Sequence, residues 1–238
     1  MPNPFFQFKQ FVVFHDKCAM KVGTDGVLAG AWAQVDGAAR ILDIGTGSGL
    51  IALMLAQRNP QAFVTAVDID GAAVEQAREN VARSPWADRM EVTQLDIRQA
   101  PEDWKDRFDA IVSNPPYFVE AVKCPHAQRN TARHTDELDF GALLAKVAFL
   151  LSDEGCFSVI LPATAASDFV ALALKQGLSL SRQTWVHPRA GLPPKRVLMA
   201  FAKSACVQTE TCHLAIEMER HVYTPEFEAL AKPFYLAL

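Results

Sequence analysis

Short apolar runs alternate with amphipathic segments from residue 41 to residue 161, and no other feature of the chain constrains the fold as much. This alternation is typical of βαβ units, which build a mostly parallel sheet with helices on its faces. Runs rich in β-branched residues predict strands buried on both faces, and apolar spacings of three and four predict helices between them. The predicted strands are Arg40–Ile44, Phe63–Val67, Met90–Gln94, Asp109–Ser113 and Cys156–Leu161, and the predicted helices are Leu50–Arg58, Gly71–Arg83, Phe140–Leu151 and Ala165–Gln176.

The segments on either side of this alternation have different patterns. Ser179–Val186 and Val197–Ala202 are predicted strands joined by a proline-rich link, so the sheet is expected to end in an antiparallel pair. Ahead of the sheet, Phe8–Phe14 alternates as a strand and Thr24 begins a helix. A strand and a short helix are expected in the tail 209–238. No linker divides the chain, which predicts one domain with an N-terminal extension 1–36, a core 37–204 and a C-terminal addition 205–238.

Charge and cysteine content exclude several classes of protein. The chain has 23 Lys and Arg against 27 Asp and Glu, a formal charge of −4, so nucleic-acid contacts have to come from local basic patches. The five cysteines are scattered without a Cys-x-x-Cys pair, which predicts buried thiols in a reducing compartment and no metal site. No segment has the pattern of a membrane span or an export signal. We therefore expect a cytoplasmic protein that does not bind membranes.

A glycine-rich loop follows the first strand of the alternation. Gly45, Gly47 and Gly49 occupy alternate positions, so a ligand can approach the backbone and the N-terminus of the next helix. The third glycine comes one position too early for the dinucleotide fingerprint Gly-x-Gly-x-x-Gly, which disfavours NAD. Asp68 ends the next strand nineteen residues after Gly49, where a carboxylate accepts both hydroxyls of a ribose. The loop and this acid predict a nucleoside-bearing ligand, with Asp70 as the alternative ribose acid.

The tetrapeptide Asn114-Pro115-Pro116-Tyr117 follows the fourth strand. Proline fixes its own φ and restricts the residue before it, so the side-chain oxygen of Asn114 and the carbonyl of Pro115 can face one cleft. Two acceptors suit a planar NH₂ group, because each holds one hydrogen and the nitrogen lone pair is directed toward an electrophile. Tyr117 adds a stacking face for the ring that carries the amine. A structural Pro-Pro loop is the alternative, but the carboxyl edge of a sheet favours a ligand site.

Several motifs in this order resemble the class I S-adenosylmethionine-dependent methyltransferases that modify exocyclic amino groups. These motifs are the glycine loop beginning at Asp43, the acid Asp68, Leu95-Asp96-Ile97 and Asn-Pro-Pro-Tyr. The resemblance implies a Rossmann-like α/β fold with a mostly parallel seven-stranded sheet and a terminal antiparallel strand. Within this class, segments 15–26, 84–87 and 234–236 are similar to the bacterial valine-tRNA adenine-N6 methyltransferases, which act on the adenine 3′ of the anticodon.

This resemblance implies S-adenosylmethionine as the cofactor and the N6 amine of a tRNA adenine as the target. Asn114 and Pro115 would hold the amine, and Tyr117 would stack on the base. Asp43 would lie near the amino group of the cofactor, Asp96 would bind its adenine beside Ile97, and the N-terminal extension would close the pocket. The implied cofactor-binding residues are Thr24, Asp25, Asp43, Gly45, Gly47, Gly49, Asp68, Asp96 and Ile97.

Two basic stretches are candidates for the RNA surface. One follows Asn-Pro-Pro-Tyr directly, and the other joins the last two strands of the predicted core. The first stretch could instead be a solvated loop whose charge is partly balanced by Asp136, Glu137 and Asp139. No obligate protein partner is predicted. The candidate RNA-binding residues are Lys123, Arg129, Arg133, Arg189, Lys195 and Arg196.

Other functions remain open at this stage. A protein glutamine also presents a planar NH₂ group, so N5-methylation of glutamine fits the same tetrapeptide. Methylation of a ribosomal RNA base fits it equally well. An RNA-binding module with a vestigial nucleotide pocket is disfavoured by the intact glycines and acids, and an NAD-dependent oxidoreductase by the glycine spacing. The basic stretches and the N-terminal resemblance favour tRNA.

Overall fold

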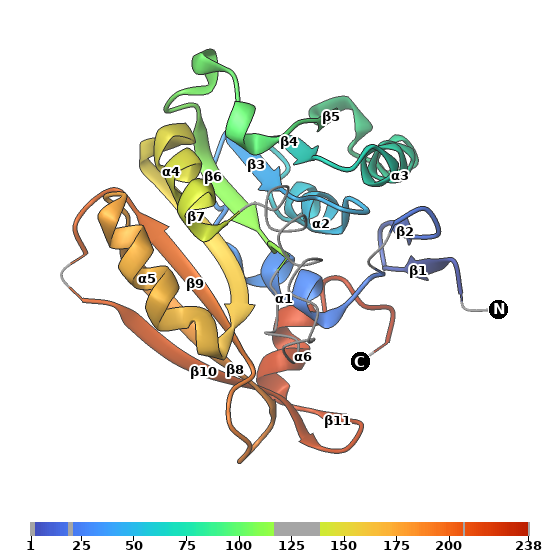
Figure 1. Cartoon of the computed structure of the whole chain (residues 1–238). Helices are drawn as coiled ribbons and strands as arrows, with labels where there is room; N and C mark the ends of the chain where they lie inside the picture. The colour runs from blue at the N-terminus through green and yellow to red at the C-terminus, as the bar shows by residue number, and fades with distance from the viewer. Residues whose placement is uncertain (1–2, 19–20, 117–138, 207, 238) are drawn as a thin grey trace, which may run out of the picture.

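A nine-stranded sheet forms the centre of the protein in the computed structural model, which describes residues 3–18, 21–116, 139–206 and 208–237. The strand order is β11-β10-β8-β9-β7-β6-β3-β4-β5, and helices cover both faces (Figure 1). The strands are β3 (Arg40–Ile44), β4 (Phe63–Asp68), β5 (Met90–Gln94), β6 (Phe108–Ser113), β7 (Leu151–Pro162), β8 (Ser179–Arg189), β9 (Arg196–Ala202), β10 (Glu210–Glu219) and β11 (Val222–Tyr223).

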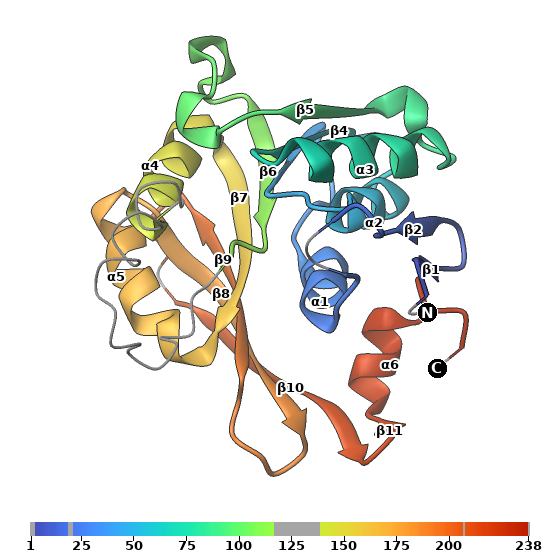
Figure 2. The same cartoon turned by 45° about the vertical axis from the view of Figure 1, so that its right-hand side comes forward.

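The helices divide into two groups on opposite faces of the sheet (Figures 1 and 2). One face packs against α1, α2, α3 and α6, and the other packs against α4 and α5, with a separate apolar core on each side. This three-layer arrangement is the one that a buried parallel sheet requires. The helices are α1 (Thr24–Trp32), α2 (Leu50–Arg58), α3 (Gly71–Ala82), α4 (Phe140–Leu150), α5 (Ala166–Lys175) and α6 (Pro225–Ala231).

The parallel part of the sheet confirms the predicted alternation. The strands β3 and β5 and the helix α2 have the predicted bounds, because each apolar run is flanked by a clear turn or cap. β3 pairs in parallel with both β4 and β6, and Ile44 lies level with Val67 and Ser113 at the strand ends. The chain leaves β3 toward β4 and β5, and then returns to build β6 and β7 on the other side. The carboxyl ends of β3 and β6 are therefore the switch point at which such sheets bind ligands.

The sheet has nine strands where seven were expected, because the C-terminal segment extends it. β10 pairs in parallel with β8, and β11 pairs antiparallel with β10. The antiparallel strand is also internal, since β9 pairs antiparallel with both β7 and β8. The expected strand and short helix of the tail are present as β10 and α6. None of the helices in the described parts of the chain combines the length and apolar character that crossing a bilayer requires.

The prediction of one strand over Phe8–Phe14 was wrong, because a turn divides this segment. The amide of Phe8 donates to the carbonyl of Phe11 at 2.9 Å, and the two rings stack with centroids 4.7 Å apart. This turn joins two short strands, β1 (Phe5–Gln7) and β2 (Val12–Phe14), in a hairpin. Burial of both rings at the turn outweighs the alternation that predicted a continuous strand.

The two ends of the described chain meet beside this hairpin (Figures 1 and 2). Phe8 forms an isolated antiparallel bridge with Tyr235, and their rings stack at a centroid distance of 5.9 Å. The amide of Lys9 donates to the carbonyl of Phe234 at 2.8 Å. The hairpin is thus held by residues from the opposite end of the sequence.

We expect Phe169→Ala to destabilise the fold strongly, because Phe169 fastens α5 to the sheet. Its side chain is 0% exposed, and its ring contacts those of Phe140, Phe157 and Phe201. Removing a buried aromatic ring leaves a cavity and should lower the free energy of unfolding by about 3–5 kcal/mol in urea titrations. Leu174→Ala on the same helix is the control, since Leu174 is 58% exposed. A loss of similar size in both variants would contradict this account of the α5 core.

Candidate active site

A cavity of about 300 Å³ lies at the carboxyl ends of β3, β4, β5 and β6. This volume is at the lower end of the range for small-molecule sites. Most of its wall is apolar, and a few polar groups interrupt that wall. The cavity brings together residues from all four motifs that the sequence singled out. The predicted site residues among its lining are Gly45, Gly47, Asp68, Asp96, Ile97, Asn114 and Pro115.

The glycine loop needs its glycines at two positions for different reasons. Gly47 has φ of +56°, and a Cβ added there would meet no atom within 4 Å, so this backbone borders open space where a ligand can lie. Gly49 has φ of +83°, and its added Cβ would lie 3.3 Å from the Cβ of Ala77 on α3. A side chain at Gly49 would therefore be strained and would push α3 away from the loop.

Asp43 supports this loop from within the core. Its Oδ2 accepts hydrogen bonds from the hydroxyl of Thr46 at 2.6 Å and from the amide of Ala52 at 3.1 Å. Its Oδ1 has no partner among the described residues. Burial raises the pKa of Asp43 to about 7, against the lowering effect of these hydrogen bonds. Asp43 is 0% exposed and is not among the lining residues, so its implied contact with the cofactor amino group stays a prediction.

Asp68 ends β4 on the cavity wall and binds two backbone amides. Its Oδ2 accepts from Gly47 at 2.8 Å, and its Oδ1 accepts from Asp70 at 3.0 Å. Asp70 also borders the cavity, but its side chain caps α3 by accepting from the amide of Ala72 at 3.0 Å. A carboxylate has room for about four hydrogen bonds. Asp68 can therefore hold the loop and still accept ribose hydroxyls. Because the side chain of Asp70 caps α3, Asp68 remains the favoured candidate for the ribose acid.

Asp96 and Ile97 follow β5, the strand next to β4, and also line the cavity. Asp96 accepts from the amide of Arg98 at 3.0 Å, and the guanidinium of Arg98 pairs with it at 2.7 Å. The hydrogen bonds from Arg98 hold the pKa of Asp96 below its ordinary value. Asp96 is thus an ionised acceptor, and Ile97 beside it is 4% exposed and gives an apolar surface. An acceptor next to an apolar wall suits an adenine with its amino group.

Asn114 leaves the end of β6 and lines the cavity together with Pro115 and Pro116. The Oδ1 of Asn114 is buried and has no hydrogen-bond partner among the described residues. The preceding residue fixes this corner, because the hydroxyl of Ser113 donates to the carbonyl of Ile44 at 2.8 Å. A buried acceptor without a donor is costly unless a ligand supplies the donor. Tyr117 lies outside the described residues.

The N-terminal candidates Thr24 and Asp25 begin α1 and are not among the lining residues. Asp25 accepts from the Nε of Arg196 at 2.8 Å, which joins a predicted cofactor residue to a predicted RNA residue. Arg189 pairs with Glu217 on β10 at 3.6 Å. Lys195 precedes β9 in the link after β8. The other RNA candidates, Lys123, Arg129 and Arg133, lie outside the described residues.

The prediction of buried thiols was wrong for Cys206 and Cys212, which are exposed. Cys18 lines the cavity, although it was not predicted as a site residue. Burial raises the pKa of its thiol to about 11, and the nearby carboxylates of Asp68, Asp70 and Asp16 act in the same direction. The thiol is therefore neutral and poorly nucleophilic near pH 7. The available signal was its place in segment 15–26, one of the segments that carry the family resemblance.

The residues of this cavity fit S-adenosylmethionine. Gly47 leaves space at the backbone, Asp68 and Asp96 offer acceptors for ribose and adenine, and Ile97 gives an apolar wall. Asn114 places at the same cavity an acceptor that no described residue uses. The described residues hold no group of three His, Cys, Asp or Glu side chains arranged to bind a metal ion.

Fold and site together define a Rossmann-like methyltransferase, and comparison with known proteins agrees. The family model described as "Methyltransferase small domain" matches residues 23–143. The chain is 58% identical to the tRNA1(Val) (adenine(37)-N6)-methyltransferase of Phocaeicola vulgatus over 99% of both chains. It is 47% identical to the Yersinia pestis protein of the same name, over 97% of this chain and 93% of that one. The chain belongs to this family of S-adenosylmethionine-dependent methyltransferases.

Solved structures support the fold at lower identity. A predicted O-methyltransferase of Agrobacterium tumefaciens aligns with a TM-score of 0.66 and 22% identity, covering 88% of this chain and 96% of that one. A glycopeptide N-methyltransferase in complex with S-adenosylmethionine aligns with a TM-score of 0.55 and 17% identity, covering 77% of this chain and all of that one. Both likenesses concern the fold alone.

We expect the variant Asp43→Asn to differ from the unaltered protein in how its free energy of unfolding depends on pH. The raised pKa means that the folded state keeps the proton of Asp43 between about pH 4 and about pH 7, whereas the unfolded state loses it. The Asp43 contribution to stability should therefore be complete below about pH 4 and fall as the pH rises to about 7, by about 1.4 kcal/mol per pKa unit. Asp43→Asn should lack this decline.

The measurement is urea unfolding of both proteins at several pH values from 4 to 8. The difference between the two curves removes the contributions of the other acids. A difference that does not change with pH would show that Asp43 is ionised in the folded protein.

Proposed function

We propose that this protein transfers a methyl group from S-adenosylmethionine to the N6 amine of adenine 37 in tRNA1(Val), the reaction for which its relatives are named. The observation that carries the proposal is that the buried Oδ1 of Asn114 has no hydrogen-bond partner among the described residues, in a residue that lines the same cavity as Gly47 and Asp68. An exocyclic adenine amine supplies the donor that this oxygen lacks. The names of the relatives favour RNA over a protein glutamine, whose amide has the same planar NH₂ group.

For this reaction the protein has to position the amine and exclude water. When bound, S-adenosylmethionine supplies a methyl group that its sulfonium already makes electrophilic. Asn114 Oδ1 and the carbonyl of Pro115 accept the two hydrogens of the amine, which directs the nitrogen lone pair out of the plane of the base. The walls of the cavity exclude water and hold the amine in line. No strong base is needed, because the amine loses its surplus proton to solvent after it has been methylated.

The parts of the chain outside the core are proposed to complete the two binding sites. Tyr117 stacks on the target adenine. The N-terminal extension 1–36 closes the cofactor pocket, which the presence of Cys18 in the cavity lining supports. Residues 1–238 form one domain, supported by the packing of α1 between α2 and α6. The tRNA substrate places the reaction in the cytoplasm, and no obligate protein partner is required.

Basic residues on two links are proposed to bind tRNA phosphates. Lys195 and Arg196 follow the β8–β9 turn, and Arg189 precedes it. Lys123, Arg129 and Arg133 come after the Asn-Pro-Pro-Tyr corner in the sequence. Phosphate contacts of this kind position an RNA without reading its sequence.

We expect Asn114→Ala to lower kcat while leaving cofactor binding intact. Loss of a hydrogen-bond acceptor that acts on the reacting group should reduce kcat by roughly 10²–10³-fold in methylation assays with tRNA1(Val). Asn114→Asp keeps the acceptor oxygens and should retain more activity than the alanine variant. Binding of S-adenosylhomocysteine, measured by calorimetry, is the control. Equal losses of cofactor affinity and kcat would contradict the role of Asn114 at the amine.

We expect the double variant Arg129→Glu and Arg133→Glu to weaken tRNA binding and to flatten its salt dependence. Each lost phosphate contact should reduce the slope of log K against log salt by about 0.7–0.9. Lys105→Glu with Lys175→Glu is the charge-matched control, since both lysines are exposed and neither lines the cavity. A salt slope that matches the control would refute the proposed phosphate contacts.

A further inference from the structure

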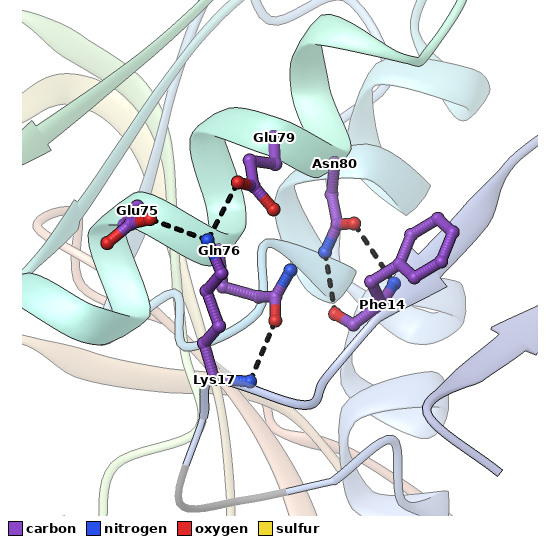
Figure 3. A network of polar contacts seen from close by, with 6 residues as sticks. All are labelled: Phe14, Lys17, Glu75, Gln76, Glu79 and Asn80. Carbon is purple, nitrogen blue, oxygen red and sulfur yellow. Dashed lines mark hydrogen bonds and ion pairs between the residues drawn. The ribbon is translucent and has the colours of Figure 1, made fainter.

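Residues 14–18, which we call the strap, follow the N-terminal hairpin, and Figure 3 shows Phe14 and Lys17 of the strap beside α3. Cys18, at the end of the strap, lines the cavity. Asn80 on α3 is the central anchor of the strap. The amide of Phe14 donates to Asn80 Oδ1 at 3.0 Å, and Asn80 Nδ2 donates to the carbonyl of Phe14 at 2.8 Å. The same Nδ2 donates to the carbonyl of Ser48 in the glycine loop at 2.8 Å. Asn80 therefore binds the strap and the glycine loop at once.

A second set of contacts fixes the strap one turn earlier on α3 (Figure 3). The amide of Lys17 donates to Gln76 Oε1 at 3.0 Å. The ammonium of Lys17 pairs with Glu75 at 2.5 Å and with Glu79 at 2.7 Å. Hydrogen bonds to these two carboxylates raise the pKa of Lys17, so it remains charged at neutral pH. The strap is thus tied to α3 at both Phe14 and Lys17.

The two partners of Asn80, Phe14 and Ser48, belong to segments that also contribute residues to the cavity lining. Cys18 follows Lys17 directly and lines the cavity, so the position of the strap sets the position of that wall. Ser48 lies between Gly47, another lining residue, and Gly49, which packs against Ala77 of α3. Ala73, Ala77 and Asn80 share one face of α3 by their spacing of four and three, and Ala73 also lines the cavity.

Asn80 is buried, so its hydrogen bonds to the strap and the glycine loop are difficult to replace. Its side chain is 1% exposed, so a lost hydrogen bond cannot be replaced readily by water. Three of the four hydrogen bonds that a side-chain amide can make are formed with the backbone of two separate segments. A residue whose only task was to stabilise α3 would not need partners in both the strap and the glycine loop.

We propose that Asn80 is a positioning residue for the cofactor: it holds the strap and the glycine loop at a fixed separation, so that two walls of the cavity are in place before the cofactor binds. This inference rests on the proposed function, because it takes the cavity to be the cofactor site. Asn80 does not touch the reacting groups in this assignment. It acts through the carbonyls of Phe14 and Ser48, which it binds.

The variant Asn80→Asp tests this role with little change of volume. A carboxylate can still accept from the amide of Phe14, but it loses both donors and faces the carbonyls of Phe14 and Ser48. Asn59→Asp is the matched control. Asn59 is also buried, at 6% exposed, and its Nδ2 donates to the carbonyls of Val35 and Ala38 at 2.7 and 2.8 Å. It ends α2 and is not among the cavity-lining residues.

Binding of S-adenosylhomocysteine by calorimetry, urea unfolding and hydrogen exchange are compared for the two variants and the unaltered protein. We expect Asn80→Asp to weaken S-adenosylhomocysteine binding about tenfold or more. It should also speed the exchange of amides in residues 14–18 and 45–49. In methylation assays it should raise the KM for the cofactor, with kcat at saturating cofactor changed by less than about twofold. Asn59→Asp should lower stability without changing cofactor affinity.

Equal affinity in Asn80→Asp and the unaltered protein would overturn the inference, as would a similar loss of affinity in Asn59→Asp. Failure of the unaltered protein to bind S-adenosylhomocysteine would instead refute the proposed function. If Asn80→Asp does not fold, Asn80→Ala replaces it, because alanine removes the three hydrogen bonds to Phe14 and Ser48 without burying a charge and is well tolerated within a helix. Unchanged affinity in Asn80→Ala would then overturn the inference.

Discussion

The turn after β3 keeps its shape because two aspartates bind it from opposite sides. Asp43 holds Thr46 and the first turn of α2 from within the core, and Asp68 holds the amide of Gly47 from the neighbouring strand. These bonds fix a backbone that has positive φ at three glycines and would otherwise have many conformations. The start of α2, the floor of the cavity and the distance to the end of β6 all depend on this turn.

The sequence predicted the parallel core well because its signals are local. Each strand from β3 to β6 is a short apolar run between turn residues, and each helix has a clear apolar spacing. The extension by β10 was harder to place, because this strand has only one buried residue, Leu214, and lacks the alternation that marks a half-buried strand. The hairpin at Phe8 was missed because the stacking of Phe8 on Tyr235 joins opposite ends of the chain, which a local sequence pattern does not reveal.

The same difference between local and distant contacts separates what could be predicted of the site from what could not. Gly47, Asp68, Asp96 and Asn114 follow strand ends, so the topology alone brings them to one edge of the sheet. The ion pair between Asp25 and Arg196 joins residues 171 positions apart, and periodicity carries no information on such a pair. The roles of the predicted residues are chemical inferences from this placement and from the family to which the chain belongs.

The bridge between Phe8 and Tyr235 has a consequence for synthesis on the ribosome. Phe14 can bind Asn80 once α3 has been made, but the residue that pairs with Phe8 comes more than 200 positions after it, so the Phe8 end of the hairpin cannot settle early in translation. The parallel core can form earlier from neighbouring βαβ units. A nascent chain would therefore have the glycine loop and the α3 contacts of residues 14–18 well before Tyr235 can pack against Phe8.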